Sequence, residues 1–233
     1  MSGVPCKICG TSSPFHGVVD FNKSCESRHR RDAVKGEAVW YNRCGECGFL
    51  FTTQFDHWTP EDWRREVYNA GYAAVDPDQA NGIRAQNNVG FVADFARQRN
   101  LTRILDFGGG DGLLARILTE GFFDAQTWDP LVDQPRPSGD FDLITAFEVF
   151  EHSANPRETV AELRSWARPH AVALVSTLTN DDWDVSHWYV SPRNGHVSMH
   201  TTRSLEKLFD QSGWTVCHLS AAVHLATRKE AGC

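Results

Sequence analysis

Two pairs of cysteines near the N-terminus have the spacing of metal ligands. Cys6 and Cys9 form one C-x-x-C knuckle and Cys44 and Cys47 form a second, and a glycine follows each pair. Four thiolates in two such pairs suit tetrahedral Zn²⁺, and the glycine lets backbone amides turn toward the sulfurs. Because four protein ligands leave no open coordination position, we expect a structural zinc ion rather than a catalytic one.

A glycine-rich segment in the middle of the chain predicts a ligand-binding loop. It lies between an apolar run at 103–107 and a helix-like stretch that begins at Leu113. In such a turn the backbone approaches a ligand closely, and the helix N-terminus offers unbonded N–H groups. The dinucleotide fingerprint G-x-G-x-x-G would need glycine at position 113, so this loop is of another kind. Its residues are Asp106, Gly108, Gly109, Gly110, Asp111 and Gly112.

An acidic residue ends the next strand-like run. Asp129 lies 17 positions beyond Gly112. A carboxylate there can accept hydrogen bonds from both hydroxyls of a ribose. The alternative is a surface aspartate before the turn-forming Pro130.

Two carboxylates and an imidazole follow the apolar run 141–147. They are Glu148, Glu151 and His152, in the pattern E-x-x-E-H. Sites in α/β proteins lie at the carboxyl ends of strands, so these side chains could bind a divalent cation or perform acid–base chemistry. A purely structural cluster is the alternative.

The stretch 181–200 predicts a lid over the site, because long irregular segments in compact domains are usually functional. It holds two Trp, one Tyr and three His residues. Histidine titrates nearest neutral pH and is the foremost candidate for a general base. Packing is the alternative role for each candidate, and the candidates are His187, Tyr189, His196 and His200.

These residues require an α/β scaffold, and the sequence beyond residue 101 has the alternation of one. Strands joined by helical crossovers form a parallel sheet. Two further strand-like runs, 214–219 and 222–227, have almost no linker between them and should pair antiparallel. The other expected strands are 103–107, 125–129, 141–147 and 170–179. One helix is expected to begin at Leu113, and two more are expected over 155–167 and 202–212.

The chain divides into three parts. Residues 1–56 have too few apolar side chains for a core and should be a zinc-binding module, since metal binding supplies folding energy. Residues 57–100 should be a helical cap, with one helix opened by Thr59 and Pro60 and a second over 79–99. Residues 101–233 should be the Rossmann-like domain.

Composition favours a cytosolic protein that acts on a small molecule. The net charge is −7, and the 16 basic against 24 acidic residues beyond position 56 argue against a nucleic-acid partner. No run approaches the roughly 18 apolar residues of a membrane span, and the N-terminus lacks a secretory pattern. Cytosolic thiols stay reduced, which favours metal ligation over disulfides.

The pattern D-x-G-x-G-x-G at 106–112 resembles motif I of class I S-adenosylmethionine-dependent methyltransferases, and the C-terminal hairpin is also similar to theirs. The resemblance implies this cofactor. It implies that Asp106 orients the amino-acid part, that the glycines make room for the nucleoside, that Asp129 holds the ribose and that Glu148 lies at the cofactor's edge.

The whole chain resembles zinc-ribbon-bearing methyltransferases, a group that includes enzymes acting on nucleotide-linked deoxysugars. That resemblance implies methyl transfer to an O, C or N atom of a small molecule. The base would come from Glu148, Glu151, His152 or His196.

The sequence departs from the family after Asp129. Only eleven residues separate it from the strand at Phe141, so the usual helix and outer strand should be trimmed or missing. The acidic residue that commonly meets the adenine amino group has no clear counterpart, and Asp133 and Asp140 are weak candidates.

The segment 148–152 is also similar to that of small-RNA 2′-O-methyltransferases, and 195–201 resembles the segment that carries their fourth metal ligand. That resemblance implies a Mg²⁺, Mn²⁺ or Zn²⁺ site at Glu148, Glu151, His152 and His196. An RNA substrate would require a basic stripe, for which the candidates are Arg28, Arg30, Arg31, Lys35 and Arg43. A non-catalytic zinc-ribbon interaction protein is a third hypothesis.

A rival zinc set is Cys6, Cys9, Cys25 and His29, in which Cys25-x-x-x-His29 resembles part of a zinc site in ribosomal-RNA guanine methyltransferases. It would leave the second knuckle unexplained. Cys217, in a strand-like run, should pack in the core, and Cys233 should be a free thiol at the end of the chain.

Overall fold

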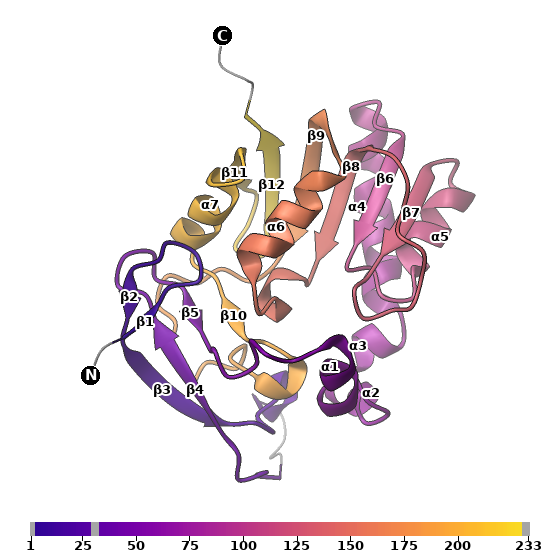
Figure 1. Ribbon diagram of the computed structural model, residues 1–233. Coiled ribbons are helices and arrows are strands. Elements are labelled where there is room, and N and C mark those ends of the chain that lie inside the picture. The colour runs from indigo at the N-terminus through magenta and orange to yellow at the C-terminus, as the bar shows by residue number, and fades with distance from the viewer. Residues whose placement is uncertain (1–2, 29–32, 230–233) are drawn as a thin grey trace.

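The computed structural model describes residues 3–28 and 33–229. Its largest layer is a six-stranded sheet of order β11-β12-β9-β8-β6-β7. Strands β7, β6, β8 and β9 are parallel, and β12 and β11 complete the sheet antiparallel (Figure 1). The strands are β6 (Arg103–Phe107), β7 (Asp124–Trp128), β8 (Phe141–Phe147), β9 (Ala167–Ser176), β11 (Trp214–His218) and β12 (Val223–Arg228).

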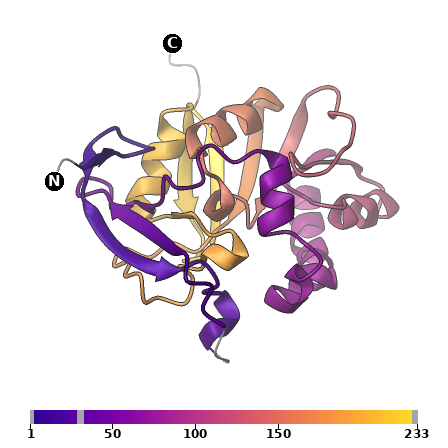
Figure 2. The same ribbon diagram turned by 60° about the horizontal axis from the view of Figure 1, so that its bottom comes forward.

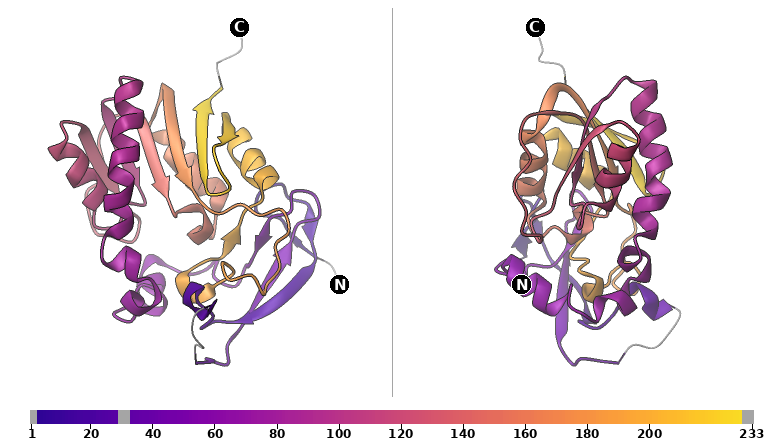
Figure 3. Two further views of the ribbon diagram at one scale, coloured as in Figure 1. Left: turned by 180° about the vertical axis from the view of Figure 1, so that it is seen from behind. Right: turned by 90° about the vertical axis from the view of Figure 1, so that its right-hand side faces the viewer.

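Helices cover both faces of this sheet. Helices α4 (Ile83–Gln98) and α5 (Leu113–Glu120) lie on one face, and α6 (Pro156–Ser165) and α7 (Thr202–Asp210) lie on the other (Figure 3). Strand β8 runs through the middle, and its first six residues are buried because side chains of both faces meet helices. The expected α/β Rossmann-like fold with a C-terminal hairpin is confirmed.

The expected loss of an outer strand is also confirmed. Residues 129–140, all of them described, contain no strand, and β7 forms the edge of the sheet.

Several element boundaries differ from the prediction, and two of the differences have a clear physical reason. The helix expected over 79–99 is divided into α3 (Pro77–Ala80) and α4, because Gly82 adopts a φ of 67° that ends one helix and begins the next. Strand β9 begins at Ala167, three residues early, and contains Pro169. The register of β8 and β9 shifts at this point, which leaves Pro169 outside the ladder where its missing N–H costs little.

A second sheet contains strands from both ends of the chain. Its order is β10-β5-β4-β3, and β10 (Ser198–Met199) pairs with β5 (Leu50–Phe51). The other elements of this half are β1 (Val4–Pro5), β2 (Ser12–Ser13), β3 (Phe15–Asp20), β4 (Ala38–Arg43) and the 3₁₀ turn η1 (Cys25–Arg28).

Figure 2 brings the carboxyl ends of the parallel strands forward, with the second sheet on the left and helices α1 to α3 on the right. Helix α1 (Pro60–Glu66) opens with the predicted cap, since Thr59 and Asp62 form a reciprocal capping box. It is followed by α2 (Tyr72–Val75). Two 3₁₀ turns, η2 (Phe150–His152) and η3 (Pro192–Asn194), complete the described elements. Among the residues the structure describes, no helix is both long and apolar enough to cross a membrane.

Candidate active site

The glycine loop connects β6 to α5 and has the backbone that its sequence requires. Gly108, Gly110 and Gly112 have φ values of 73°, 56° and 77°, which side chains other than glycine's rarely allow. At Gly109 the limit is space, since a Cβ would lie 2.1 Å from Oδ2 of Asp106. The loop therefore wraps closely around the carboxylate at the end of β6.

Asp106, near the end of β6, and Asp129, directly after β7, both lie against this loop. Asp106 is buried and accepts a hydrogen bond from the Thr145 hydroxyl at 2.9 Å. Burial, with the nearby charge of Asp129, raises the pKa of Asp106 to about 7. Oδ2 of Asp129 accepts the Gly110 N–H at 3.0 Å, and Oδ1 accepts the Leu131 N–H at 2.7 Å. The Asp129 carboxylate is thus fixed against the loop.

The surroundings of the loop fit S-adenosylmethionine better than a nucleotide. A Cβ at Gly110 would meet nothing closer than Nε2 of Gln79 at 3.8 Å, so the loop has open space on this side. Two carboxylates beside it would repel a pyrophosphate but suit a sulfonium and an ammonium group.

Glu148 directly follows β8 and is held in a strained conformation. Its φ is 54°, in the left-handed region that glutamate seldom adopts. Its N–H donates to Oγ of Ser176 at 3.0 Å, and the same hydroxyl donates to Oε1 of Glu148 at 2.9 Å. Burial and the charge of Glu151 raise the pKa of Glu148 to about 7. Val149 then packs against Gly108, which brings this segment to the glycine loop.

Glu151, His152 and His196 form one cluster, with ligand atoms within 4.8 Å of one another. Glu151 is fully buried, and its Oε1 accepts the Tyr189 hydroxyl at 2.6 Å. Its Oε2 has no hydrogen-bond partner among the described residues. Nδ1 of His152 lies 3.1 Å from the Tyr68 hydroxyl. The structure therefore brings a distant histidine to the E-x-x-E-H turn, as the sequence predicted.

The tautomer of His196 follows from its partner. Its Nδ1 lies 2.8 Å from the Tyr189 carbonyl oxygen, which only accepts, so Nδ1 carries the proton. Nε2 then has the free lone pair. Burial lowers the pKa of both His196 and His152 and raises that of Glu151. The cluster consequently joins two neutral imidazoles to an acid that binds its proton more tightly than usual.

The other base candidates have different surroundings. His200 is fully buried between the rings of Phe49 and Phe150, and burial lowers its pKa to about 3, so it is a core residue. The Tyr189 hydroxyl donates to Glu151, and burial raises the pKa of Tyr189 well above its ordinary value, so its proton is engaged with that carboxylate. Nδ1 of His187 accepts the Tyr189 N–H at 3.2 Å.

Three supporting residues carry no sequence motif. Ser176 holds Glu148, Tyr68 contacts His152, and the Tyr41 hydroxyl donates to the His196 carbonyl oxygen at 2.7 Å. Each acts across at least 28 residues of sequence. Local patterns therefore could not reveal them.

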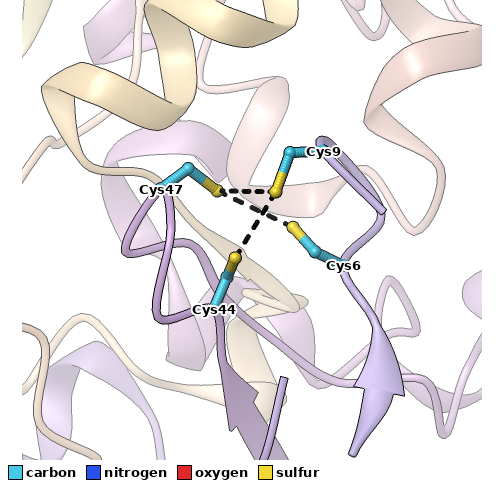
Figure 4. Close-up of side chains that lie close together, drawn as sticks. All are labelled: Cys6, Cys9, Cys44 and Cys47. Carbon is cyan, nitrogen blue, oxygen red and sulfur yellow. Dashed lines mark hydrogen bonds between the residues drawn. The ribbon is translucent and has the colours of Figure 1, made fainter. Parts of the chain in front are cut away.

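The four predicted cysteines converge on one point, from the two knuckles (Figure 4). Cys6 and Cys47 sulfurs are 3.7 Å apart, Cys9 and Cys44 3.5 Å, and Cys9 and Cys47 3.8 Å. A tetrahedron with Zn–S bonds of about 2.3 Å has edges of about 3.8 Å. The donor set and spacing thus fit zinc, and the four-cysteine cluster is confirmed.

The remaining cysteines lie elsewhere. Sγ of Cys25 is 3.0 Å from Oγ of Ser191 and is not part of the four-cysteine cluster, while His29 of the rival set lies outside the described residues. Cys217 is exposed on β11, contrary to the core packing expected, because its side chain points away from the α7 face. Cys233 also lies outside the described residues.

Neither weak candidate for the adenine contact gains support. Asp133 and Asp140 are exposed. Asp140 precedes β8, at the opposite end of the parallel strands from the glycine loop, and so cannot reach the cofactor.

A mostly parallel Rossmann-like sheet with a C-terminal hairpin, and a glycine loop after β6, defines the class I fold of S-adenosylmethionine-dependent methyltransferases. The chain belongs to the family described as "Methyltransferase domain", which matches residues 55–219. It is therefore a methyltransferase, and the predicted enzyme class is confirmed, with S-adenosylmethionine as the cofactor of the family.

Solved structures share the fold at low identity. An O-methyltransferase family protein from Burkholderia thailandensis is 15% identical with a TM-score of 0.51, over 78% of this chain and 71% of that one. CalS10, an amino pentose methyltransferase from Micromonospora echinaspora, is 13% identical with a TM-score of 0.51, over 65% and 96%. No curated protein matches the sequence.

Proposed function

We propose that the chain transfers the methyl group of S-adenosylmethionine to an oxygen, carbon or nitrogen atom of a small molecule. The observation that carries the proposal is the cluster of Glu151, His152 and His196 after β8, which Val149 connects to the glycine loop through its contact with Gly108. These residues supply acid–base groups where the acceptor would meet the methyl group.

The protein's own residues would hold the reactants and move one proton. The bound cofactor supplies an electrophilic methyl group, and its sulfur takes the electron pair of the broken C–S bond. Asp129 and the glycine loop orient the adenosyl part, which lowers the entropy cost of an in-line attack. The acceptor's proton passes to Glu151 or to the free Nε2 of His196.

Charge at the surface favours a small acceptor over RNA. Of the proposed basic stripe, Arg30 and Arg31 lie outside the described residues. Lys35 forms an ion pair with Glu37 at 3.0 Å, and Arg43 donates to the Asp181 carbonyl oxygen at 2.7 Å. The side chains of Lys35 and Arg43 are therefore not arranged as free phosphate ligands. CalS10, whose fold is similar, acts on an amino pentose.

Two metal ions fit donor sets of this chain. Zn²⁺ at the four cysteines would be structural. At the second set, the unpaired Oε2 of Glu151 and the lone pairs of His152 and His196 match the one-carboxylate, two-imidazole pattern that binds divalent transition metals. Glu148, which the sequence placed in this set, is not one of the three residues whose ligand atoms come within 4.8 Å of one another, and its Oε1 accepts the Ser176 hydroxyl instead. If this second set holds a metal ion, chelation should abolish turnover. If it is a metal-free acid–base cluster, chelation should leave turnover unchanged.

The test is a screen of small-molecule acceptors and RNA for transfer of a labelled methyl group, with and without EDTA pretreatment. The proposal expects transfer to a small molecule. Transfer to RNA alone, with a steep fall in affinity as salt rises, would contradict it. Loss of turnover after EDTA with the zinc content unchanged would assign a cation to the second site. The cytosolic location stays a prediction.

A further inference from the structure

Arg84 brings a positive charge to a site lined by carboxylates. It lies in the first turn of α4, and its Nη1 donates to Oδ2 of Asp76 at 2.8 Å. Asp76 is 8% exposed, and its Oδ1 accepts the Gln79 N–H, which caps α3. Within the described part of the chain, this is the one hydrogen bond that the Arg84 guanidinium makes. Its other N–H donors are thus available to a ligand.

The start of α4 is packed against the glycine loop. Nε2 of Gln79 is the nearest group to the open side of Gly110. Gly82 lies against Leu113, the first residue of α5, so closely that a Cβ on Gly82 would be 2.5 Å from Cδ2 of Leu113. Arg84, two residues after Gly82, is therefore placed beside the loop.

The charge of Arg84 also reaches the residues at the end of β8. It lowers the pKa of Glu148, against the larger effect of burial, which raises it. It also adds to the effect of burial in lowering the pKa of His152 and His196. Arg84 is therefore near enough to the carboxylate–histidine cluster to act on its charges, and its helix start lies beside the loop.

We propose that Arg84 binds the carboxylate of the amino-acid part of S-adenosylmethionine, an inference that rests on the proposed function. Asp106 and Glu148 suit the cationic groups of the cofactor, but its carboxylate needs a cation in this acidic site. An arginine fork pairs with a carboxylate through two parallel N–H···O bonds. Because Asp76 already holds Arg84 in place, binding loses little side-chain entropy.

Two ligands that differ only in the amino-acid part test the assignment. S-adenosylhomocysteine has the carboxylate, and 5′-methylthioadenosine keeps the adenosine and thioether without it. Affinities are measured by calorimetry for wild type, Arg84→Gln, Arg84→Lys and the matched control Arg97→Gln, an exposed arginine of the same helix. Thermal melts check folding.

We expect Arg84→Gln to weaken S-adenosylhomocysteine binding roughly ten- to hundredfold. The affinity for methylthioadenosine should stay within about twofold of the wild-type value. Arg84→Lys should be intermediate, and Arg97→Gln unchanged. Equal weakening of both ligands would overturn the proposal and make Arg84 a packing residue. Unchanged affinities with a raised KM for the acceptor would assign Arg84 to the acceptor instead. If wild type binds neither ligand, the proposed function itself fails.

Discussion

Burial shifts the pKa values of neighbouring residues in opposite directions at this site. It raises the pKa of Glu148 to about 7 and also raises that of Glu151, whereas it lowers those of His152 and His196. The carboxyl pKa values thus move toward neutrality, where protons exchange readily at physiological pH, whereas the two imidazoles stay neutral. The chemistry therefore depends on water being excluded from the cluster.

Glu151→Gln tests the proton acceptor. The amide has the same shape and still accepts the Tyr189 hydroxyl, so the fold should survive. We expect kcat to fall about 10²- to 10⁴-fold, a usual range for loss of a general base. Affinity for S-adenosylhomocysteine should stay within about twofold. The surface variant Glu158→Gln is the control, and a kcat for Glu151→Gln within about threefold of wild type would exclude Glu151 as the base.

Asp106 should make stability depend on pH. The folded state binds the Asp106 proton more tightly than the unfolded chain does. The bound proton therefore stabilises the fold below the folded-state pKa of about 7, and this stabilisation is lost as pH rises through that value. From pH 5.5 to 7.5 the loss is roughly 2 kcal/mol. Urea unfolding of wild type and Asp106→Asn at both pH values should show this difference, since the buried histidines affect both proteins alike. Equal pH dependence in the two proteins would show that Asp106 titrates normally.

At the scale of elements, the turn between β6 and α5 determines where the cofactor can lie. Gly109→Ala would place a Cβ against Oδ2 of Asp106 and Oγ1 of Thr127, so we expect at least a tenfold loss of S-adenosylhomocysteine affinity, on the order of 1.4 kcal/mol or more. Gly90→Ala is the matched control on α4, where a Cβ meets nothing within 4 Å. It should stabilise the protein by about 0.5–1 kcal/mol. Calorimetry and thermal melts compare the two, and undiminished binding by Gly109→Ala would contradict the loop's close packing.

Elements with a strong local pattern could be predicted from the sequence, and those that depend on distant contacts could not. The run 141–147 predicted β8, and Thr59 with Pro60 predicted α1. The break at Gly82 was missed because glycine is tolerated within a helical pattern, and its φ of 67° depends on packing against Leu113. Likewise, no pattern revealed that β10 pairs with β5.

At the scale of the whole molecule, the cysteine half and the catalytic half share hydrogen bonds. The Thr52 N–H donates to the Val197 carbonyl oxygen, and the Val197 N–H donates to the Glu151 carbonyl oxygen. The Tyr41 hydroxyl holds the backbone of His196. We propose that residues 1–56 form a zinc module, 57–100 a helical cap and 101–233 the Rossmann-like domain. These contacts imply that the zinc module supports the catalytic geometry.

Zinc removal should therefore affect more than the N-terminal module. For Cys47→Ser we expect loss of the zinc ion held by the four cysteines, a lower melting temperature and a large fall in kcat, since structural zinc supplies folding energy. Elemental analysis, thermal melts and kinetics measure the three effects. Cys217→Ser, on exposed β11, is the control. A zinc-free variant with full activity would show that the two halves are independent.

Binding of S-adenosylhomocysteine, measured by calorimetry on wild type and Asp129→Ala, tests the central claim most directly. We expect one binding event per chain in wild type. Without the Asp129 carboxylate, which we propose holds the ribose, affinity should fall at least tenfold, on the order of 1.4 kcal/mol. A folded, zinc-loaded wild type that binds no S-adenosylhomocysteine, or a variant that binds it equally well, would contradict the site described for this chain.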